Sequence, residues 1–549
     1  MAHKGTRKGI TRRSFIKGVA IGAGAAAAAG SGLLGARSRN NALAAIPTGA
    51  GPISTAGLPA SWDHKTDVLV LGAGGAGLAA AVAAGETGAK VMVLEKNPSC
   101  GGDTATAMVF MSRTRDSRFH KRLGMKPIPL SAAFAQGTAG FACRNNCEVE
   151  RTIIARDGAT ADWLEDMGVV YYPGPAAGAP PGFMLTPQDP DGGYYRWFPH
   201  NAKGFTQRLE KRARDLSIRF FLATPATTLV TKAGRVMGVT AKTEKGETLN
   251  IKARVTVLAT GGFGANKAML EKYALPVVFA GIAHYIGLPS ATGDGIRMAQ
   301  GVGAVVEGMD DFEMWDGGPP GVGEGPMSFY NAATQLVRQK SLTVNKLGKR
   351  FMDESLLYGH GHEIGAFKSQ AFQTIRQKDQ TSFTIHDSDT VKKDFIIKRF
   401  EPVACEYPCP WYEKDFKRRV KEGIIIKADS IGDLARLMDI DPKALEETLN
   451  NYNKYCDKKT DPEFFKPAKY LIPIRKPPFY AVKQVGGALF NTWGGLVTNT
   501  RFEVLDKDWK PIPGLRVAGE NAAYCASVVY AITSGRIAGE NAAREALWK

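Results

Sequence analysis

Apolar residues gather in three short runs that lie far apart along the chain, and a glycine-rich turn follows each run. The first run, 67–71, ends at Gly72, and an alanine-rich stretch then leads to a second apolar segment that ends at Glu95. Short apolar runs bounded by turns are typical of strands buried on both faces, and a longer apolar stretch between two of them is typical of a helix. The pattern predicts a strand, a tight turn, a helix and a strand over 67–96.

The two later runs repeat this pattern. The stretch "ARVTVLATGGFGAN" predicts a strand that ends at Thr260, Gly261 and Gly262, and "IPGLRVAGENAAYCASVVYAI" predicts a strand, then Gly519 and Glu520, then a helix. Strands that alternate with helices indicate an α/β fold with a parallel sheet. We therefore expect an α/β protein whose nucleotide-binding unit is closed by three distant parts of the chain.

The first turn has the spacing of a dinucleotide-binding loop. Gly72, Gly74 and Gly77 form GxGxxG between the predicted strand and helix, where the backbone must turn sharply and approach a pyrophosphate. The amides at a helix N-terminus favour an anion there. Glu95 follows Gly77 by 18 residues, where a carboxylate can bind ribose hydroxyls. A glycine-rich turn without a ligand is the alternative, but strand, helix and acid together favour a nucleotide site.

The N-terminal segment is predicted to be an export signal. Arg12 and Arg13 precede "SFIK" and a weakly apolar run at 19–34, and "ALA" at 42–44 resembles a cleavage site. The run contains fewer strongly apolar residues than the roughly 20 that a spanning helix needs, so a membrane anchor is the less favoured alternative. The arginine pair resembles the twin-arginine signature, whose route carries proteins already folded around a cofactor. We expect residues 1–44 to be removed, which leaves a periplasmic or otherwise extracytoplasmic protein without a membrane span.

Charge and composition narrow the choice of partners. The chain has 549 residues and a formal charge of +18, and the first 44 residues hold eight Lys or Arg and no acid, so the processed chain carries about +10. An apolar fraction of 44% over this length is enough for a large core and favours two domains. A basic surface can attract an acidic redox partner, an anionic lipid surface or an anionic substrate. Without a basic run beside aromatic residues, we do not expect nucleic acid as a partner.

The seven cysteines include two CxxxC pairs, Cys143 with Cys147 and Cys405 with Cys409. Outside the cytoplasm such a pair can close a disulfide, and four thiolates can hold an iron–sulfur cluster. The pairs lie about 260 residues apart and neither has a cluster spacing, which favours free or disulfide-bonded cysteines. We predict no metal site, and no CxxCH motif for covalent haem is present.

Ordered motifs along most of the chain resemble one flavoprotein family. They include "VLGAGGAGLAAA", "LEK" followed by "GGDT", "ATGGFGAN", "ATGDGIRMA", "LTVNKLGKRFMDE", "GIIIKADSIGDLARLMDID", "PPFYAV" and "GRIAGENAA". Over residues 64–549 the chain is similar to the FAD-dependent flavoproteins of the fumarate reductase and succinate dehydrogenase class. The similarity is strongest to the soluble, exported fumarate, urocanate and acrylate reductases, and more distant to 3-ketosteroid dehydrogenases.

The resemblance implies a Rossmann-like FAD-binding domain of residues 64–309 and 491–549, with a mobile α+β cap domain of residues 310–490 inserted into it. It places the first glycine loop at the pyrophosphate, Glu95 at the adenosine ribose, and Asp294 and Glu520 on the ribityl and isoalloxazine side. The predicted FAD contacts are Gly72, Gly74, Gly75, Ala76, Gly77, Glu95, Lys96, Gly101, Gly102, Thr104, Ala105, Thr260, Gly261, Gly262, Asp294, Glu520, Ser527 and Val528.

The residues themselves support the last of these contacts. Ser527 and Val528 begin an apolar helix, whose N-terminal amides can meet the N1–O2 edge of the flavin. We expect them to stabilise negative charge at that edge by roughly 1 kcal/mol.

The substrate pocket departs from the family. Counting from "KRF", the proton-donating arginine of the fumarate reductases falls on Tyr358, and the glutamate of their proton relay falls on Gln335, while Arg338 is kept. The two histidines that hold a substrate carboxylate in the family line up with Trp315 and Asn491.

A second family arginine that clamps the substrate is also missing, because only 14 residues separate Glu520 from Gly535. A buried carboxylate without strong donors costs several kcal/mol. We therefore expect a neutral, aromatic or polycyclic α,β-unsaturated substrate of the enone or enoate type, such as a ketone, a lactone or a phenolic compound.

In the predicted reaction, flavin N5 passes hydride to the β-carbon and Tyr358 donates a proton, its phenol pKa lowered by Arg338. A packed tyrosine of the cap is the alternative role for Tyr358. His360 and His362 in "YGHGH" are other candidate proton donors, with solvent-facing loop residues as the alternative, and His360 is assigned to the substrate site with Trp315, Gln335 and Asn491.

The compartment indicates the electron source. NAD(P)H is scarce outside the cytoplasm, so we expect electrons from a quinol pool through a separate cytochrome, as in a terminal reductase of anaerobic respiration. Two other functions stay open. One is a dehydrogenase of a ketosteroid-like substrate, and the other is an FAD protein without catalytic activity that relays electrons or binds a partner.

Overall fold

The computed structural model describes residues 57–107, 110–141, 143–171, 184–185, 203–316, 340–357, 371–392 and 411–548. Its largest sheet runs from edge to edge through β18 (Glu503–Leu505), β19 (Pro511–Val517), β8 (Thr248–Leu258), β1 (His64–Leu71), β2 (Val91–Leu94) and β5 (Arg219–Phe221), and β7 (Arg235–Lys242) and β6 (Ala226–Lys232) extend it from β8. The strands from β19 to β5 are parallel, whereas β18, β7 and β6 pair antiparallel. The predicted α/β class is confirmed.

The central strand β1 explains why its sequence is apolar without alternation. Val68, Leu69 and Val70 are fully buried, so both faces of the strand are covered. Val70 lies opposite Val93 on β2 and Val257 on β8. The buried strand delivers the glycine turn that follows it to the carboxyl edge of the sheet, where ligands bind in open α/β folds.

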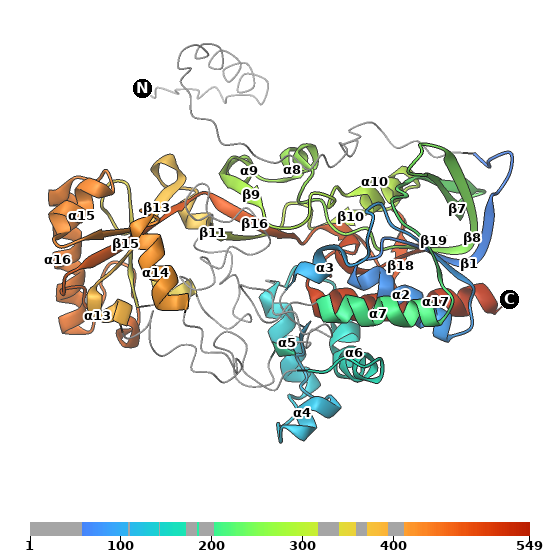
Figure 1. Ribbon diagram of the computed structural model, residues 1–549, viewed down its shortest axis with the longest axis horizontal. Coiled ribbons are helices and arrows are strands. Elements are labelled where there is room, and N and C mark those ends of the chain that lie inside the picture. Colours follow the sequence, from blue (N-terminus) through green and yellow to red (C-terminus); the bar gives the residue numbers. More distant parts are fainter. Residues whose placement is uncertain are drawn as a thin grey trace, which may run out of the picture. The chain divides into compact units, whose positions relative to one another are not determined.

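Helices α2 (Gly75–Glu86) and α17 (Val528–Leu547) lie side by side (Figure 1). A Cβ atom on Gly535 would collide with the carbonyl oxygen of Ala76, and one on Gly539 would collide with that of Ala80. Glycine at both positions therefore lets the two helix backbones touch. The contact pairs the middle of α17 with the start of α2, and the two helices run in the same direction, so the first turns of α17 extend beyond the N-terminus of α2.

The remaining helices of this part of the chain are α3 (Gly102–Thr106), α4 (Arg118–Arg122), α5 (Leu130–Gly140), α6 (Cys147–Asp166), α7 (Lys203–Asp215) and α10 (Asp294–Gly301). The small pairs β3 (Phe110–Met111) with β4 (Met184–Leu185) and β10 (Val306–Glu307) with β17 (Gly495–Leu496) join them, and the turn η5 (Gly519–Asn521) precedes α17. Of these helices, α3, α6 and α7 contact α2 or α17, α4 and α5 contact α6, and α10 contacts β6 and β17.

A three-stranded sheet has the order β11 (Phe312–Asp316), β16 (Gly487–Thr492), β9 (Ile282–Tyr285). Phe312, Met314 and Leu489 are buried in one hydrophobic cluster on one face of this sheet, together with residues of α8 (Lys267–Tyr273) and α9 (Pro276–Gly281). Because side chains alternate between the faces of a strand, Glu313 lies on the opposite face. A bulge after Leu489 pairs Asn491 with Glu313, so Asn491 shares that face.

A four-stranded antiparallel sheet has the order β12 (Leu342–Asn345), β13 (Thr381–His386), β15 (Phe479–Val485), β14 (Ile425–Ala428). Helices α15 (Ile431–Leu437) and α16 (Pro442–Lys458) contribute to its hydrophobic core. The short elements η1 (Glu354–Leu357), η2 (Lys378–Gln380), α13 (Ser388–Thr390), α14 (Trp411–Lys421) and η4 (Ala468–Tyr470) complete this part of the chain. All of it falls within the predicted cap, residues 310–490, although the division into two domains stays a prediction.

The core of this sheet contains a buried ion network. The Nη2 atom of Arg350 lies 3.0 Å from Glu354 Oε2 and 2.9 Å from Asp461 Oδ2, and Lys466 Nζ lies 3.2 Å from Glu354 Oε2. Burial would raise the pKa of Glu354, but the positive charges of Lys466 and Arg350 hold it below its usual value. The motif "GKRFMDE" thus supplies both partners of an internal ion pair.

The predicted signal, residues 1–44, lies outside the described residues. Among the helices of the described part of the chain, none combines the length and the apolar character needed to cross a bilayer.

Candidate functional site

The predicted nucleotide loop joins β1 to α2. Gly72 has φ +101°, and a Cβ atom there would collide with the carbonyl oxygen of Ala259 on the neighbouring strand connection. A Cβ atom on Gly77 would collide with the carbonyl oxygen of Gly72. The first and last glycines of GxGxxG are therefore required by the turn itself, whereas the nearest atom to a Cβ on Gly74 is 3.8 Å away, at Gly102.

Glu95 stands at the end of β2, as predicted, and its side chain reaches back to the glycine loop. Its carboxylate accepts hydrogen bonds from the backbone amides of Ala73, at 2.7 Å, and Asn97, at 2.8 Å. A carboxylate oxygen has two acceptor positions, so each oxygen can still accept a hydroxyl. Glu95 thus keeps acceptor positions for the predicted ribose contact.

The next predicted contacts lie beside this loop. Gly74 and Gly101 form a parallel backbone bridge, and the amide of Gly75 donates to Thr104 Oγ1 at 3.2 Å. Gly101 and Gly102 both have positive φ, at +125° and +52°, which permits the sharp entry into α3. The loop of residues 101–105 is thereby held against the N-terminus of α2, where Ala76 also lies.

Lys96 links this region to α10. Its Nζ atom lies 2.8 Å from Asp294 Oδ2 and 2.7 Å from Thr292 Oγ1. Burial would raise the pKa of Asp294, but the charge and hydrogen bonds of Lys96 keep it below its usual value, so the carboxylate is ionised. Lys96 and Asp294, predicted separately, are thus one ion pair.

Asn521 ties three distant segments together. Its Oδ1 atom accepts from the backbone amide of Thr260 at 2.5 Å, its Nδ2 atom donates to the carbonyl oxygen of Gly261 at 2.8 Å, and the hydroxyl of Thr260 accepts from the amide of Gly295. Sequence reasoning missed Asn521. The signal available was its place directly after the predicted Glu520.

Glu520 lies close to the end of β16. Its Oε1 atom accepts from both the amide and the hydroxyl of Thr492, each at 2.9 Å. Gly262 makes room for this carboxyl group, since a Cβ atom there would collide with it. Burial and the nearby Asp103 raise the pKa of Glu520 to about 7.

Asp103 and Tyr285 complete this cluster, and sequence reasoning missed both. Asp103 accepts from the amide of Leu288 at 2.6 Å and from the hydroxyl of Tyr285 at 3.3 Å. Burial raises the pKa of Asp103, which these hydrogen bonds only partly oppose. The ring of Tyr285 fills space that a side chain at Gly264 or Gly287 would occupy.

Ser527 begins α17 in a conformation that side chains rarely adopt, with φ +101° and ψ 157°. Its hydroxyl is buried and has no hydrogen-bond partner among the residues that the structure describes. A Cβ atom on Gly261, by contrast, would meet nothing within 4 Å. An orphaned hydroxyl at a helix N-terminus, beside Val528, and open space at Gly261 both fit a polar cofactor such as FAD, and Glu95 fits its ribose.

On the predicted substrate side, Glu313 and Asn491 are paired across β11 and β16. The Nδ2 atom of Asn491 donates to Glu313 Oε2 at 2.7 Å, and Glu313 is buried. Trp315 pairs with Ala488 on the same two strands through its backbone. Glu313 is a further residue that sequence reasoning missed, because the family alignment considered only the two histidine positions.

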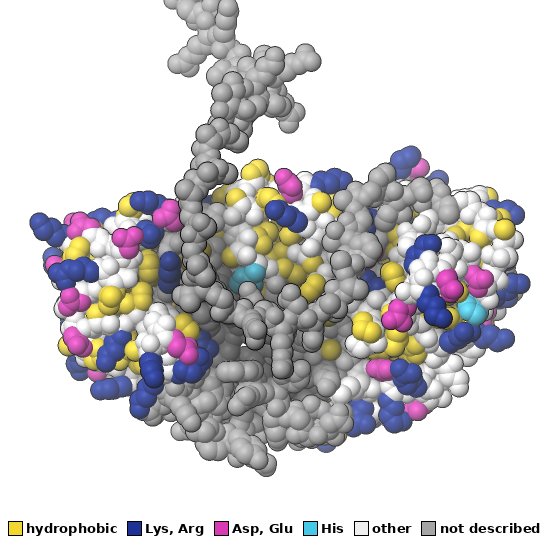
Figure 2. Space-filling model, turned by 45° about the horizontal axis from the view of Figure 1, so that its top comes forward, with side chains coloured by type: hydrophobic (Ala, Val, Ile, Leu, Met, Phe, Trp, Pro, Cys, Tyr) yellow, Lys and Arg dark blue, Asp and Glu magenta, His cyan; other side chains and the backbone are white. Residues whose placement is uncertain are grey.

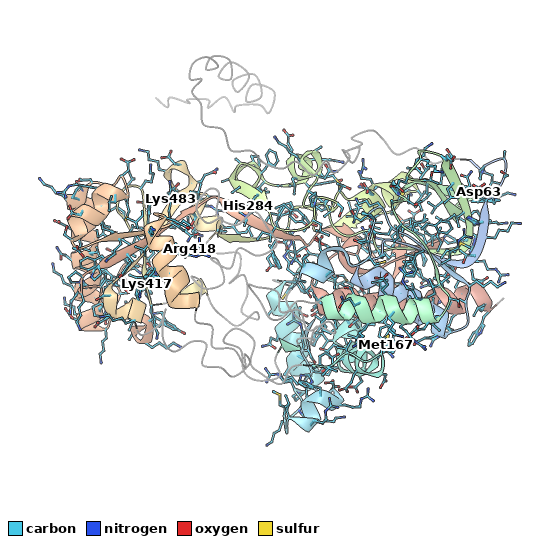
Figure 3. The ribbon with its side chains drawn as sticks, in the orientation of Figure 1. Asp63, Met167, His284, Lys417, Arg418 and Lys483 are labelled. Carbon is cyan, nitrogen blue, oxygen red and sulfur yellow. The ribbon has the colours of Figure 1, made fainter. Side chains whose placement is uncertain are left out.

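His284 lies on β9, where Figure 3 labels it. Its backbone pairs with Ala488 along the edge of β16 opposite to β11. The paired positions Trp315, Ala488 and His284 therefore form one row across the sheet. The remaining predicted substrate and catalytic residues lie outside the described residues: Gln335, Arg338, Tyr358 and His360. Their roles stay predictions.

The cysteine pairs are only partly within the described chain. Cys143 and Cys147 are exposed and free, and Cys405 and Cys409 lie outside the described residues. Within the described ranges, no three His, Cys, Asp or Glu side chains are grouped so that they could hold a metal ion.

Comparison with known proteins identifies the family and the cofactor. The family described as "FAD binding domain" matches residues 67–534. The vinyl phenol reductase of Lactiplantibacillus plantarum is 29% identical over 510 residues, which cover 87% of this chain and 96% of that protein.

Two solved structures have similar folds. One is the open conformation of a flavocytochrome c3 fumarate reductase, with a TM-score of 0.68 and 26% identity, covering 89% of this chain and 80% of that chain. The other is the 3-ketosteroid-Δ4-(5α)-dehydrogenase of Rhodococcus jostii RHA1 in complex with 4-androstene-3,17-dione. It has the same TM-score and identity, and the match covers 89% of this chain and 99% of that chain.

Proposed function

Because the chain belongs to the family of FAD-binding domains matched over residues 67–534, we propose that it reduces the activated carbon–carbon double bond of a neutral, aromatic or polycyclic α,β-unsaturated substrate. The coarser activity comes with the family and its relatives: the chain is an FAD-dependent oxidoreductase acting on carbon–carbon bonds. The proposal concerns which substrate it takes and where its electrons come from.

One observation carries the choice of a neutral substrate. Asn491 stands where the family has a histidine for a substrate carboxylate, and its amide is held by the carboxylate of Glu313 at 2.7 Å. A substrate carboxylate placed beside Asn491 would thus lie near another acid rather than near an imidazolium. Like charges brought together in a poorly hydrated pocket are costly, so an uncharged substrate is favoured.

The residues divide the work as follows. Bound FAD supplies hydride at N5. Asn491, with Glu313 behind it, orients the substrate through its amide, and Trp315 supports the proposed apolar body of the substrate. Tyr358 supplies the proton to the substrate, and the positive charge of Arg338 would lower the pKa of its phenol.

The relatives support this substrate class by their names. Vinyl phenol, named for one relative, is neutral and aromatic. The bound 4-androstene-3,17-dione of the ketosteroid dehydrogenase is neutral and polycyclic. That second likeness also supports the rival function, dehydrogenation of a ketosteroid-like substrate.

Export and electron supply are part of the proposal. Twin-arginine export would place the folded, FAD-loaded protein in the periplasm, where a quinol-linked cytochrome can donate electrons, as in anaerobic respiration. The processed chain keeps a formal charge of about +10, which favours an acidic donor. On the face in Figure 2, Lys and Arg are interspersed with Asp and Glu, so attraction would come from the net charge rather than from one basic patch there.

The direct test supplies the FAD-loaded enzyme with a reduced viologen dye and compares 4-vinylphenol, a steroid enone, a neutral cinnamate ester and fumarate. We expect kcat/KM for the preferred neutral compound to exceed that for fumarate by roughly 100-fold. Faster consumption of fumarate than of every neutral compound would overturn the proposal. Oxidation of a saturated ketosteroid by a dye acceptor, without any reduction, would establish the rival dehydrogenase, and no turnover in either direction would favour an electron relay.

A further inference from the structure

The sheet β11–β16–β9 has one face in the hydrophobic core and one face that is not part of that core. Phe312, Met314 and Leu489 occupy the core face. Glu313 lies between Phe312 and Met314 on β11 and therefore points to the second face. A bulge between the pairs Met314–Leu489 and Glu313–Asn491 places Asn491 directly opposite Glu313, on the same face. Any hydrogen bond between their side chains therefore belongs to the face that does not join the core.

This face is connected to the predicted flavin site through one residue. Thr492 follows Asn491, and both its amide and its hydroxyl donate to Glu520. The backbone position of Asn491 is thus fixed next to a predicted cofactor contact. A substrate that reaches the flavin there would meet the side chain of Asn491.

The chemistry of Glu313 determines which way the amide of Asn491 points. An ionised carboxylate only accepts hydrogen bonds, whereas an amide has a donor end and an acceptor end. The end that faces Glu313 must therefore be the NH2 group, in agreement with the 2.7 Å contact from Asn491 Nδ2. The carbonyl oxygen of Asn491 then points away from Glu313. Among the residues that the structure describes, the bond to Glu313 is the one hydrogen bond of the Asn491 side chain.

We propose that Glu313 is a positioning residue, which fixes the Asn491 amide so that its carbonyl oxygen faces the substrate and selects substrates that carry a hydrogen-bond donor, such as a phenolic hydroxyl. The inference rests on the proposed function, and it names the recognition element of that site. A histidine at this position can donate to a carboxylate; the fixed asparagine instead offers an acceptor. When the ligand carries no donor, the carbonyl oxygen of Asn491 is left without a hydrogen bond. An ether is therefore a poorer ligand than the corresponding phenol.

The test compares 4-vinylphenol with 4-vinylanisole, which differ only in the hydroxyl hydrogen and a methyl group, and 4-ethylphenol with 4-ethylanisole as ligands that are not reduced. In the FAD-loaded wild-type enzyme we expect both kcat/KM and the dissociation constant, from flavin difference spectra, to favour the phenol by about tenfold or more. In Glu313→Gln the neighbour can donate as well as accept, so Asn491 can turn over. The phenol preference should then fall to within about threefold.

Controls separate positioning from a general loss of structure. Asp310→Asn removes a nearby carboxylate whose side chain is 49% exposed, and it should keep the phenol preference. Asn491→Ala should lose the preference even where Glu313→Gln folds poorly, because it removes the acceptor itself. The selectivity ratio is the readout, since partial unfolding lowers both rates alike.

The outcomes are distinct. If wild type treats the phenol and the ether alike, or if Glu313→Gln keeps the full preference, the inference is overturned while reduction of neutral substrates stands. If wild type neither reduces any neutral alkene nor binds either ethyl arene, the proposed function fails with it.

Discussion

At the scale of single residues, Glu520 combines burial with a neighbouring acid, and this has a consequence for pH. Its pKa of about 7 lies above the ordinary value of 4.5 for a glutamate. Between these two values the folded protein keeps a proton that the unfolded chain releases. The contribution of this group to the unfolding free energy of the FAD-free protein should therefore be largest below pH 4.5. It should fall as the pH rises to about 7 and then level off.

The variant Glu520→Gln cannot release this proton and should lose that part of the pH dependence. The difference corresponds to about 3 kcal/mol at most between pH 4.5 and pH 7. Denaturant unfolding of FAD-free wild type and variant at pH 5 and pH 7.5 measures it. Glu247→Gln, on an exposed turn, should follow wild type. A variant as sensitive to pH as wild type would contradict the assignment.

The sequence predicted single residues well where a short motif determines them. Gly72 is required by its positive φ and Gly77 by the backbone contact within the same turn, and Glu95 is positioned by the strand it ends, so local spacing was enough. Asp103 and Asn521 escaped prediction, because their partners lie far away in the sequence, at Tyr285 and Thr260. The orientation of a side chain across such distances depends on tertiary packing, which no local pattern encodes.

At the scale of elements, the buried network behind β12 and η1 makes a sharp stability prediction. Glu354 is the common partner of Arg350 and Lys466, and its other oxygen accepts from the amide of Thr343 at 3.0 Å. Glu354→Gln would leave two buried cations with less compensation. We expect a loss of about 3 to 5 kcal/mol in the unfolding free energy of this part of the chain.

Urea unfolding followed by tryptophan fluorescence tests this loss. The matched control is Glu463→Gln, since Glu463 lies 3.7 Å from Arg350 but its side chain is 41% exposed. That substitution should cost less than about 1 kcal/mol, as is usual for exposed ion pairs. Equal losses in both variants would mean that burial does not govern the strength of this network.

The sequence predicts buried parallel strands better than the order of an antiparallel sheet, because only the former have a local signature. The strand, turn, helix and strand over 67–96 are found as β1, α2 and β2, because parallel strands covered on both faces have continuous apolar sequences. The order of the sheet β12–β13–β15–β14 could not be predicted from local patterns. Its antiparallel pairs join segments such as 381–386 and 479–485, whose register depends on contacts formed only after folding.

At the scale of the whole molecule, the family predicted from ordered motifs is confirmed by the match over residues 67–534. The cofactor and the reaction class follow from it. The substrate does not, because the predicted proton donor Tyr358 and its neighbours lie outside the described residues.

Export is a whole-molecule property with its own prediction. Replacing both Arg12 and Arg13 by lysine keeps the charge but removes the paired guanidinium groups of the proposed signal. The full-length, FAD-loaded precursor should then accumulate in the cytoplasm. Cell fractionation and N-terminal sequencing measure this.

The control replaces Arg37 and Arg39 by lysine, which changes as many residues within the same segment but leaves the pair intact. This variant should be exported and cleaved near Ala45. Normal export of the Arg12 and Arg13 variant would rule out the twin-arginine route.

The chain passes from β15 to β16 through the single residue Gly486, whose φ is +61° and where a Cβ atom would lie 2.8 Å from the carbonyl oxygen of Gly281. One continuous segment thus belongs first to the four-stranded sheet and then to the sheet that carries Asn491, and it ends with Thr492 on Glu520. Such a segment can transmit a displacement from one sheet to the other, with Gly486 as the point of bending. A displacement of the first sheet would move the proposed substrate contact, Asn491, and the proposed cofactor contact, Glu520, together, so the affinities for the two molecules would change in parallel.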